Sequence, residues 1–246
     1  MKKPIFCTTG DTAALRQAKN QLLHWGYDVE SSPNNNVTHL ILPVPSFETD
    51  GNLKGNIPFD NVLSHLPQDV IVFGGNLPAL PRKSIDFLKD EYYLAENATI
   101  TAHCTMDLLT QRSPIPLNSA KILLIGWGRI GKQLSSLLKA QGMQVTVAAR
   151  NPSDLQTLSH LGYLTTTTHN LSAEGYDIII NTVPALILEI GEPDSTVLKI
   201  DLASNKGIIG KSILWARGLP NQMAPDLSGI LIAKTALRYA LGKESI

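Results

Sequence analysis

The chain has 246 residues, of which 43% are hydrophobic, so it can bury a sizeable core and is about the size of two small domains. Basic and acidic residues balance at 21 each, which excludes an overall field that attracts nucleic acid or an anionic membrane. The two cysteines, Cys7 and Cys104, form neither a disulfide framework nor a metal-ligand pattern. We therefore expect a globular protein with no metal, no nucleic-acid partner and no membrane partner.

The sequence predicts no secretory or membrane-spanning segment. Lys2 and Lys3 are followed by the polar residues 8–11 before an adequate apolar run develops. The most apolar later stretch, residues 178–190, is too short to span a bilayer and is interrupted by Asn181 and Pro184. These features favour a soluble, cytoplasmic protein.

Residues 1–96 alternate short apolar runs with helical patterns, which is typical of a small three-layer α/β domain. We expect a flavodoxin-like arrangement for this domain. It lacks a phosphate-binding glycine motif, so it is predicted to lie on the substrate side. The expected strands are residues 5–9, 27–29, 38–45 and 70–73, the expected helices are residues 14–25 and 59–65, and residues 84–88 and 92–94 complete the pattern.

A linker helix is predicted between the two domains, within residues 97–116. The helical pattern of residues 97–112 is ended by Ser113-Pro-Ile-Pro116, because proline disfavours helical geometry in the residue before it. His103 and Asp107 lie four residues apart and share a face of this helix. They are either a base with its orienting carboxylate or an ordinary surface pair. His103 is our candidate for a catalytic proton step.

A dinucleotide-binding fingerprint follows in residues 121–150. An apolar strand leads into Gly126-Trp-Gly128-Arg129-Ile130-Gly131, a helical pattern and a second strand, which is the βαβ context that makes the motif specific. Gly126 permits the tight turn, Gly128 lets a pyrophosphate approach, and Gly131 lets the helix lie close to the strand. Arg129 and Ile130 begin a helix whose free N–H groups and dipole favour phosphate. The alternative is a glycine-rich turn without a ligand.

The end of the second strand indicates which dinucleotide binds. NAD sites usually carry an acid there, which binds the ribose 2′-hydroxyl, whereas this chain has Ala149-Arg150-Asn151-Pro-Ser153 and no acid until Asp154. A guanidinium can pair with a 2′-phosphate and stack on adenine. We expect NADP as the cofactor, with Arg150, Asn151 and Ser153 in its site. The alternative is a solvated arginine at a strand end.

Two further strands end in polar segments that are predicted to meet the ligands, because a doubly wound sheet binds ligands at the carboxyl ends of its strands. The strand at residues 177–180 is followed by Asn181-Thr182-Val183-Pro184, and the strand at 196–200 by Asp201-Leu-Ala-Ser204-Asn205-Lys206. We expect the first segment and Asp201 to hold the cofactor. Ser204, Asn205 and Lys206 are the candidates for contacting substrate, with Ser204 and Lys206 as catalytic candidates.

The remaining pattern completes a doubly wound, Rossmann-type parallel sheet over residues 117–222. Helices are expected at residues 155–161 and 212–217. The last apolar segment, residues 227–241, lies in a C-terminal region (223–246) that we expect to form a helix and to pack back across the interdomain cleft.

The order of several motifs resembles that of the dipicolinate synthase A family. The resemblance covers most of the chain, from residue 41 to the C-terminal helix. The similar segments are Ile41-Leu-Pro-Val-Pro45, Gly126-Trp-Gly-Arg-Ile-Gly131, Val147-Ala-Ala-Arg150, Asn181-Thr-Val-Pro184, Ile200-Asp-Leu-Ala-Ser204, Gly218-Leu-Pro220 and Ala224-Pro225.

This resemblance implies two α/β domains, NADP as hydride acceptor, and oxidation of a dihydrodipicolinate-type precursor to dipicolinate, the biosynthetic step associated with sporulation. It implies a small dicarboxylate-type substrate and a dipicolinate synthase B-like flavoprotein as a partner. We further expect a homo-oligomer.

Three segments depart from the family's pattern. Asn205 precedes Lys206 where the family tends to have lysine directly, Pro225-Asp-Leu-Ser-Gly229 replaces a Pro-Lys-Thr-Ala-Gly stretch, and His103-Cys104 falls near the family's Glu-Gly. Two alternatives stay open: a catalytically silent NADP(H)-binding homologue, and another small imine or 2-keto acid reductase. A simple 2-hydroxyacid dehydrogenase is disfavoured, because its Arg, Glu and His constellation is not found in matching places.

Overall fold

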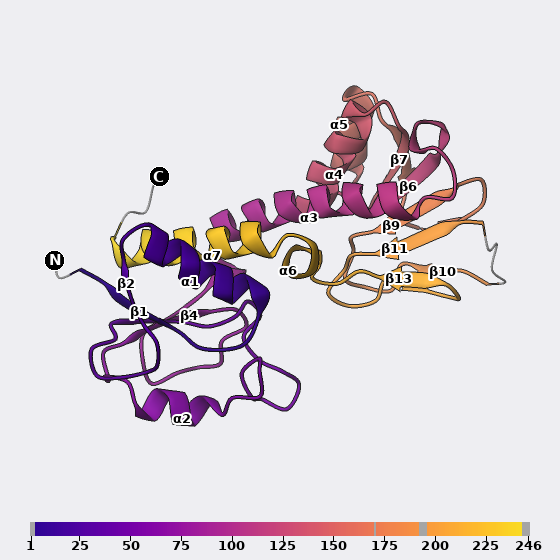
Figure 1. Ribbon diagram of the computed structural model, residues 1–246. Coiled ribbons are helices and arrows are strands. Elements are labelled where there is room, and N and C mark those ends of the chain that lie inside the picture. Colours follow the sequence, from indigo (N-terminus) through magenta and orange to yellow (C-terminus); the bar gives the residue numbers. More distant parts are fainter. Residues whose placement is uncertain (1–2, 170, 192–195, 243–246) are drawn as a thin grey trace. The chain divides into compact units, whose positions relative to one another are not determined.

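The computed structural model describes residues 3–169, 171–191 and 196–242 (Figure 1). The chain divides into two compact units: Met1–Asn97 with Pro220–Ile246 form the first, and Ala98–Leu219 form the second. The chain therefore begins the first unit, builds the second, and then returns to the first. No helix in the described part of the chain is long and apolar enough to cross a membrane.

The first unit is built on a five-stranded sheet whose neighbouring strands are all parallel. Its order, β2-β1-β3-β4-β5, is that of flavodoxin-like folds, so the flavodoxin-like prediction is confirmed. The apolar runs of the sequence become its core, in which Phe6, Leu40 and Phe73 are fully buried. The strands are β1 (Ile5–Thr8), β2 (Asp28–Glu30), β3 (His39–Ile41), β4 (Ile71–Gly74) and β5 (Ser84–Asp86).

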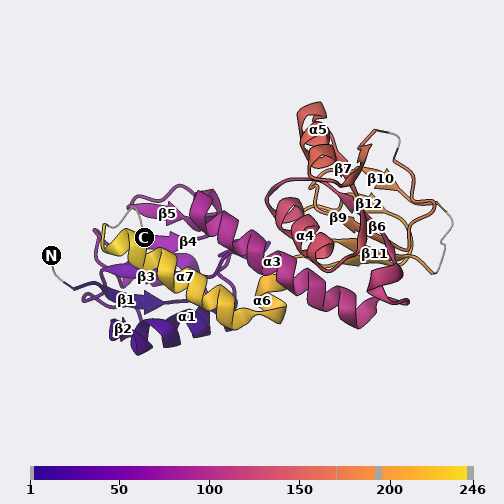
Figure 2. The ribbon, with the colours of Figure 1, turned by 90° about the horizontal axis from the view of Figure 1, so that it is seen from above.

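Helices cover both faces of this sheet (Figure 1), and Figure 2 looks down on the face that carries α7. α1 (Ala13–His24) begins where the Thr12 hydroxyl accepts a hydrogen bond from Leu15 N, a typical N-cap. It packs against α7 (Pro225–Ala240), and α2 (Phe59–Ser64) lies on the opposite face. Gly229 permits the close α1–α7 contact, because a Cβ there would lie 2.5 Å from the Cβ of Gln17.

Asp90 attaches the C-terminal helix to the start of α3 (Glu91–Arg112), which begins earlier than the helix predicted from residue 97 and includes residues 92–94. The Asp90 carboxylate accepts hydrogen bonds from Tyr93 N at 2.7 Å, from Arg238 and from the Tyr239 hydroxyl. Burial raises the pKa of this carboxyl, but the hydrogen bonds outweigh burial and leave its pKa below the ordinary value. These contacts make α7 an integral part of the first unit.

His39 gives the first unit a predictable pH dependence. It lies on β3 between the rings of Phe6 and Phe73, whose centroids are 5.4 and 5.6 Å from its own. Burial, with a smaller contribution from Lys83, lowers the pKa of His39 to about 4. The folded protein thus keeps His39 neutral where the unfolded chain takes up a proton. The stability that His39 contributes is complete above about pH 6.5 and is lost as the pH falls toward 4.

From this residue alone we expect a free energy of unfolding about 2 kcal/mol lower at about pH 5 than at about pH 7. Urea unfolding of the wild type and of His39→Phe, which keeps an aromatic ring between Phe6 and Phe73, measures the difference. The variant should lose less stability than the wild type over this pH range. Equal losses in the two proteins would contradict the assignment.

The second unit contains a six-stranded parallel sheet with the order β13-β11-β9-β6-β7-β8. This is the strand order of Rossmann-type folds, in which the order reverses between the first and fourth strands, here β6 and β9. The predicted Rossmann-type sheet is therefore confirmed. Its strands are β6 (Lys121–Ile125), β7 (Gln144–Ala149), β8 (Leu164–Thr167), β9 (Ile178–Asn181), β11 (Leu198–Asp201) and β13 (Ile213–Trp215).

The two faces of this sheet are covered differently (Figure 1). α4 (Arg129–Ala140) and α5 (Pro152–His160) pack on β6, β7 and β8. On the other face the connections carry a short two-stranded sheet of β10 (Leu188–Glu189) and β12 (Ile208–Ile209), which packs on β6 through Leu188 and Ile208. Two short 3₁₀ turns, Phe87–Lys89 and Leu117–Ser119, and α6 (Leu219–Met223) complete the elements of the two units.

One predicted element is wrong. The sequence predicts a helix at residues 212–217, but Ile213–Trp215 forms β13 and pairs in parallel with β11. Ile and Trp favour strands, and Ser212 has a φ of 58°, which a right-handed helix does not contain. β8 is not predicted, because its Leu-Thr-Thr-Thr sequence is mostly exposed and carries no apolar alternation.

Candidate cofactor site

The glycine-rich turn after β6 has steric requirements that only glycine meets. Gly126 has a φ of 96°, and a Cβ there would lie 2.5 Å from Thr182 Oγ1. A Cβ at Gly131 would lie 2.2 Å from the carbonyl oxygen of Gly126, so α4 can approach the turn only without a side chain. At Gly128, the N-cap of α4, a Cβ would meet nothing within 4 Å. The space in front of Gly128 is therefore open, as pyrophosphate binding requires.

A cavity of about 590 Å³ adjoins this turn at the carboxyl ends of β6, β7 and β9, a volume typical of small-molecule sites. Arg129 and Ile130 begin α4, and their side chains do not line the cavity. The predicted residues that do line it are Gly126, Gly128, Arg150, Asn151, Thr182, Val183 and Pro184. The lining residues that the sequence does not predict are Trp127, Ala149, Asp154, Thr168, Ala185 and Ile187.

The end of the cavity at β7 brings together one cation and one acid. Arg150 is exposed, and its guanidinium makes no hydrogen bond or ion pair with the described residues. Asn151 caps α5: its Oδ1 accepts hydrogen bonds from Ser153 N and Ser153 Oγ, both at 3.1 Å. Asp154, in the first turn of α5, lines the same cavity. Of Arg150, Asn151 and Ser153, only Arg150 carries a charge, and this charge is available for a ligand.

Asn181 and Asp201 form a buried network that holds two loops together. They are the last residues of β9 and β11 and lie opposite each other in the register. Asn181 Nδ2 donates to Asp201 Oδ1 at 2.9 Å and to Val183 O at 2.9 Å. The Asp201 carboxylate also accepts from the backbone N–H groups of Ala203, Gly207 and Ile208 at 2.7–3.0 Å. Both side chains therefore shape the cavity wall from behind.

The structure describes no contact among the three catalytic candidates, His103, Ser204 and Lys206. Ser204 and Lys206 are exposed on the loop after β11, with Lys206 Nζ 5.1 Å from the ring centroid of Trp215. His103 and Asp107 are exposed on α3, and His103 is not among the residues that line the cavity at Gly126. The described residues include no group of His, Cys, Asp and Glu that could hold a metal ion.

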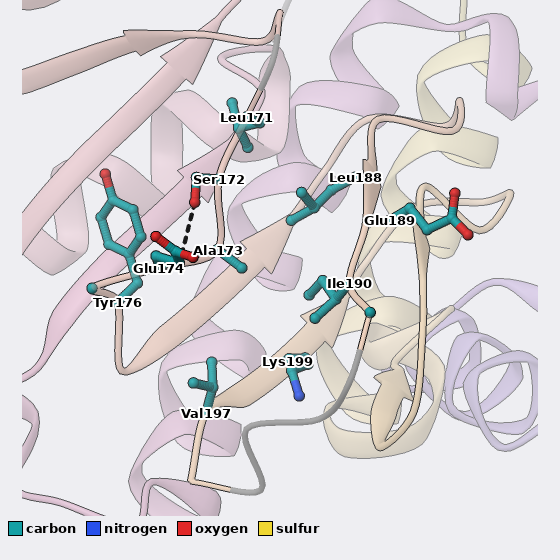
Figure 3. A pocket seen from close by; sticks show the side chains of 12 residues that line it. Leu171, Ser172, Ala173, Glu174, Tyr176, Leu188, Glu189, Ile190, Val197 and Lys199 are labelled. Atoms are coloured by element: carbon teal, nitrogen blue, oxygen red, sulfur yellow. Dashed lines mark hydrogen bonds between the residues drawn. The ribbon is translucent and has the colours of Figure 1, made fainter.

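A second cavity of about 400 Å³ lies on the face covered by β10 and β12 (Figure 3). It is lined by residues 171–176, by residues 188–191, and by Val197 and the buried Lys199. It shares no lining residue with the first cavity. Short strands and loops cover this face of the sheet, and they leave more space than a packed helix would. One of these loops contains a turn in which Glu174 N donates to Ser172 Oγ at 3.1 Å (Figure 3).

Known proteins resemble this chain in both sequence and structure. Residues 91–187 match the family described as D-isomer specific 2-hydroxyacid dehydrogenase, NAD binding domain. The A subunit of dipicolinate synthase from Bacillus subtilis (strain 168) is 25% identical over 228 residues, which are 85% of this chain and 77% of the relative. The chain resembles dipicolinate synthase A.

Solved structures extend this resemblance over both units. The A chain of dipicolinate synthase from Bacillus subtilis has a TM-score of 0.79 at 21% identity, and the match covers 99% of this chain and 97% of that one. Its counterpart from Bacillus halodurans has a TM-score of 0.81 at 19% identity, covering 96% and 97%. These structures confirm the fold over both units, and the resemblance predicted from the ordered motifs is confirmed. The family match and the Bacillus subtilis relative support an NAD(P)-dependent oxidoreductase.

Proposed function

We propose that this protein is an NADP-dependent dehydrogenase of the dipicolinate synthase A type, which oxidises a dihydrodipicolinate-type precursor to dipicolinate. The observation that carries the proposal is the cavity at the glycine-rich turn, with the open space at Gly128 in its middle. At one end of this cavity lies the guanidinium of Arg150, which pairs with no residue that the structure describes. Dipicolinate synthase A resembles this chain over most of its length.

The residues of the cavity divide between the parts of the dinucleotide. Gly128 and the N–H groups that begin α4 would receive the pyrophosphate. Arg150 would pair with a 2′-phosphate on the adenosine ribose. Thr182, Val183 and Pro184 form the wall across the sheet from β7 and would line the nicotinamide half. Thr182 is fixed there because its hydroxyl donates to Ile125 O at 3.0 Å.

NADP⁺ supplies a hydride acceptor when it is bound, and the chain's own residues supply the rest. Lys206 would attract a carboxylate of the substrate, and the Ser204 hydroxyl would donate a hydrogen bond to it. Oxidation also releases a proton, and we propose His103 as its acceptor, because an imidazole nitrogen can accept a proton. The same proposal includes a dipicolinate synthase B-like flavoprotein as partner, a homo-oligomeric state, and a cytoplasmic location in a spore-forming cell.

Replacing Arg150 by alanine tests the cofactor assignment. A hydrogen bond to a charged group contributes about 1.5–3 kcal/mol, so NADPH affinity should fall about 10–100-fold, while NADH affinity should change little. Calorimetric titration measures both. Trp127 lines the same cavity, so energy transfer from its indole to the bound nicotinamide gives a second readout. The matched control is Arg112→Ala, at an exposed arginine that ends α3.

Three outcomes separate the alternatives. Preference of the wild type for NADH would mean that Asp154, which lines the same end of the cavity, binds the ribose and that the NADP assignment is wrong. Tight NADPH binding without turnover of dihydrodipicolinate-type substrates, with the flavoprotein partner present, would favour a silent binding protein. Substrate-dependent formation of NADPH absorbance would support the proposed reaction.

A further inference from the structure

Trp215 lies beside the proposed substrate loop in a position that its own hydrogen bond fixes. Its indole Nε1 donates to Ala203 O at 2.9 Å, which joins the end of β13 to the loop after β11. About 40% of the residue remains exposed. Trp215 ends β13, so this fixed and accessible aromatic side chain lies at the carboxyl edge of the Rossmann-type sheet, the edge at which ligands of this fold bind.

Two cations lie close to this indole. Lys206 Nζ is 5.1 Å from the centroid of the Trp215 ring, and Arg217 Cζ is 6.0 Å from it, both within the range of cation–π contacts. Lys206 comes from the loop after β11, and Arg217 follows β13 by two residues. The result is an accessible aromatic surface with a positive charge contributed by each of two neighbouring loops.

This surface is connected directly to the wall of the cofactor cavity. Ile187, which lines the cavity, donates its backbone N–H to Gly207 O at 2.8 Å. A Cβ at Gly207 would lie 2.5 Å from Val183 O, so the loop that carries Lys206 is packed tightly against the segment proposed to line the nicotinamide half. A group bound at Trp215 would therefore contact the same loop that borders the segment proposed to line the nicotinamide half.

We propose that Trp215 determines substrate specificity by stacking on a planar ring that carries carboxylates, with Lys206 and Arg217 binding the carboxylates. The inference rests on the proposed function, to which it adds the residues that recognise the ring and its carboxylates. An aromatic face favours a flat π-system over a puckered ring, and two cations on separate loops suit two separate carboxylates. Dicarboxylates of equal charge that lack a π-system, such as saturated-ring or aliphatic ones, are then poorer ligands.

The test compares two ligands of equal charge on the NADP⁺ complex of the full chain. Pyridine-2,6-dicarboxylate is planar, and cis-cyclohexane-1,3-dicarboxylate is not. We expect the planar ligand to bind about tenfold more tightly, from the added stacking, and to quench indole fluorescence, a signal that should disappear in Trp215→Phe. Lys206→Gln and Arg217→Gln should each lower the affinity for both ligands about fivefold, and this loss should become smaller with added salt.

Two substitutions separate the ring face from the hydrogen bond. Trp215→Phe loses the bond to Ala203 but keeps an aromatic face, so it should keep most of the preference for the planar ligand. Trp215→Leu loses both and should bind the two ligands equally. Three results would each overturn the inference. The first is that the Phe and Leu variants bind the planar ligand equally well, and the second is that Trp215→Leu still prefers the planar ligand. The third is that the NADP⁺ complex binds neither dicarboxylate.

The same titrations keep this inference distinct from the proposed function. NADPH binding is measured on every variant and should not change, since Trp215 does not line the cofactor cavity. If NADP(H) does not bind to the wild type, the proposed function fails, and the ligand comparison is made without cofactor. If NADP(H) binds and the planar preference is independent of Trp215, only this inference fails.

Discussion

Alanine at position 131 is expected to abolish tight dinucleotide binding and to destabilise the second unit. The new Cβ would lie 2.2 Å from Gly126 O and 2.9 Å from Gly126 C. Both are backbone atoms and cannot rotate away, so either α4 or the turn must move. Such overpacking costs about 1–3 kcal/mol, occasionally more. Since the same movement displaces the turn and the start of α4, NADPH affinity should fall by about 100-fold or more, equivalent to about 2.7 kcal/mol.

Gly128→Ala is the matched control, because the same methyl group is added three residues earlier. There a Cβ meets nothing within 4 Å, and the backbone has an ordinary extended conformation with φ −78°. The stability of Gly128→Ala should remain within about 0.5 kcal/mol of the wild type, while the methyl group occupies the proposed pyrophosphate space and weakens NADPH binding. Hydrogen exchange of the β6 and α4 amides reports the stability of this unit. Undiminished NADPH affinity in Gly128→Ala would show that the pyrophosphate does not pass over this residue.

Replacing Asp201 by asparagine is expected to cost about 3 kcal/mol of stability. The buried carboxylate accepts two hydrogen bonds at each oxygen: from Asn181 Nδ2 and Ala203 N at Oδ1, and from Gly207 N and Ile208 N at Oδ2. In either orientation of the amide, two donors would face an NH₂ group. Each hydrogen bond to a charged group contributes about 1.5–3 kcal/mol, and its loss leaves a buried donor unpaired. The loosened loops should also raise the KM for substrate.

Asp177→Asn is the matched control, because it makes the same chemical change at a carboxylate with fewer hydrogen bonds. Asp177 Oδ2 accepts one hydrogen bond, from Lys121 N at 2.8 Å, and the residue is only half-buried. Its loss should cost about 1 kcal/mol. Urea unfolding and substrate kinetics of the two variants, measured side by side, give the comparison. If the two variants lose equal stability, the Asp201 network does not hold the loops as described.

The fold could be predicted from the sequence wherever local pattern and tertiary context agree. The apolar runs at residues 122–125 and 178–180 become the buried parts of central strands, because strands covered on both faces need apolar side chains throughout. The glycines of the motif follow from backbone geometry at one turn. By contrast, β10 and β12 have two residues each, which is too short for any periodicity to appear.

The candidate site could be predicted only in part, because register is not visible in a sequence. Asn181 and Asp201 end two strands and are natural candidates for ligand contact. They lie opposite each other in neighbouring strands, so their polar groups bind each other and the loop backbone. Trp215 is missed because its segment is predicted as a helix, and Thr168 because β8 has no apolar pattern. Trp215 and Thr168 thus lie at or just after the ends of strands that the pattern does not reveal.

The return of the chain to the first unit has a consequence for synthesis on the ribosome. Residues Ala98–Leu219 leave the exit tunnel as a contiguous stretch and can fold as soon as they emerge, as is usual for domains. The sheet that precedes them cannot be finished then, because α1 still lacks α7 and Asp90 still lacks Arg238 and Tyr239. The portion made first is therefore completed last, and until then its apolar surface needs protection from aggregation.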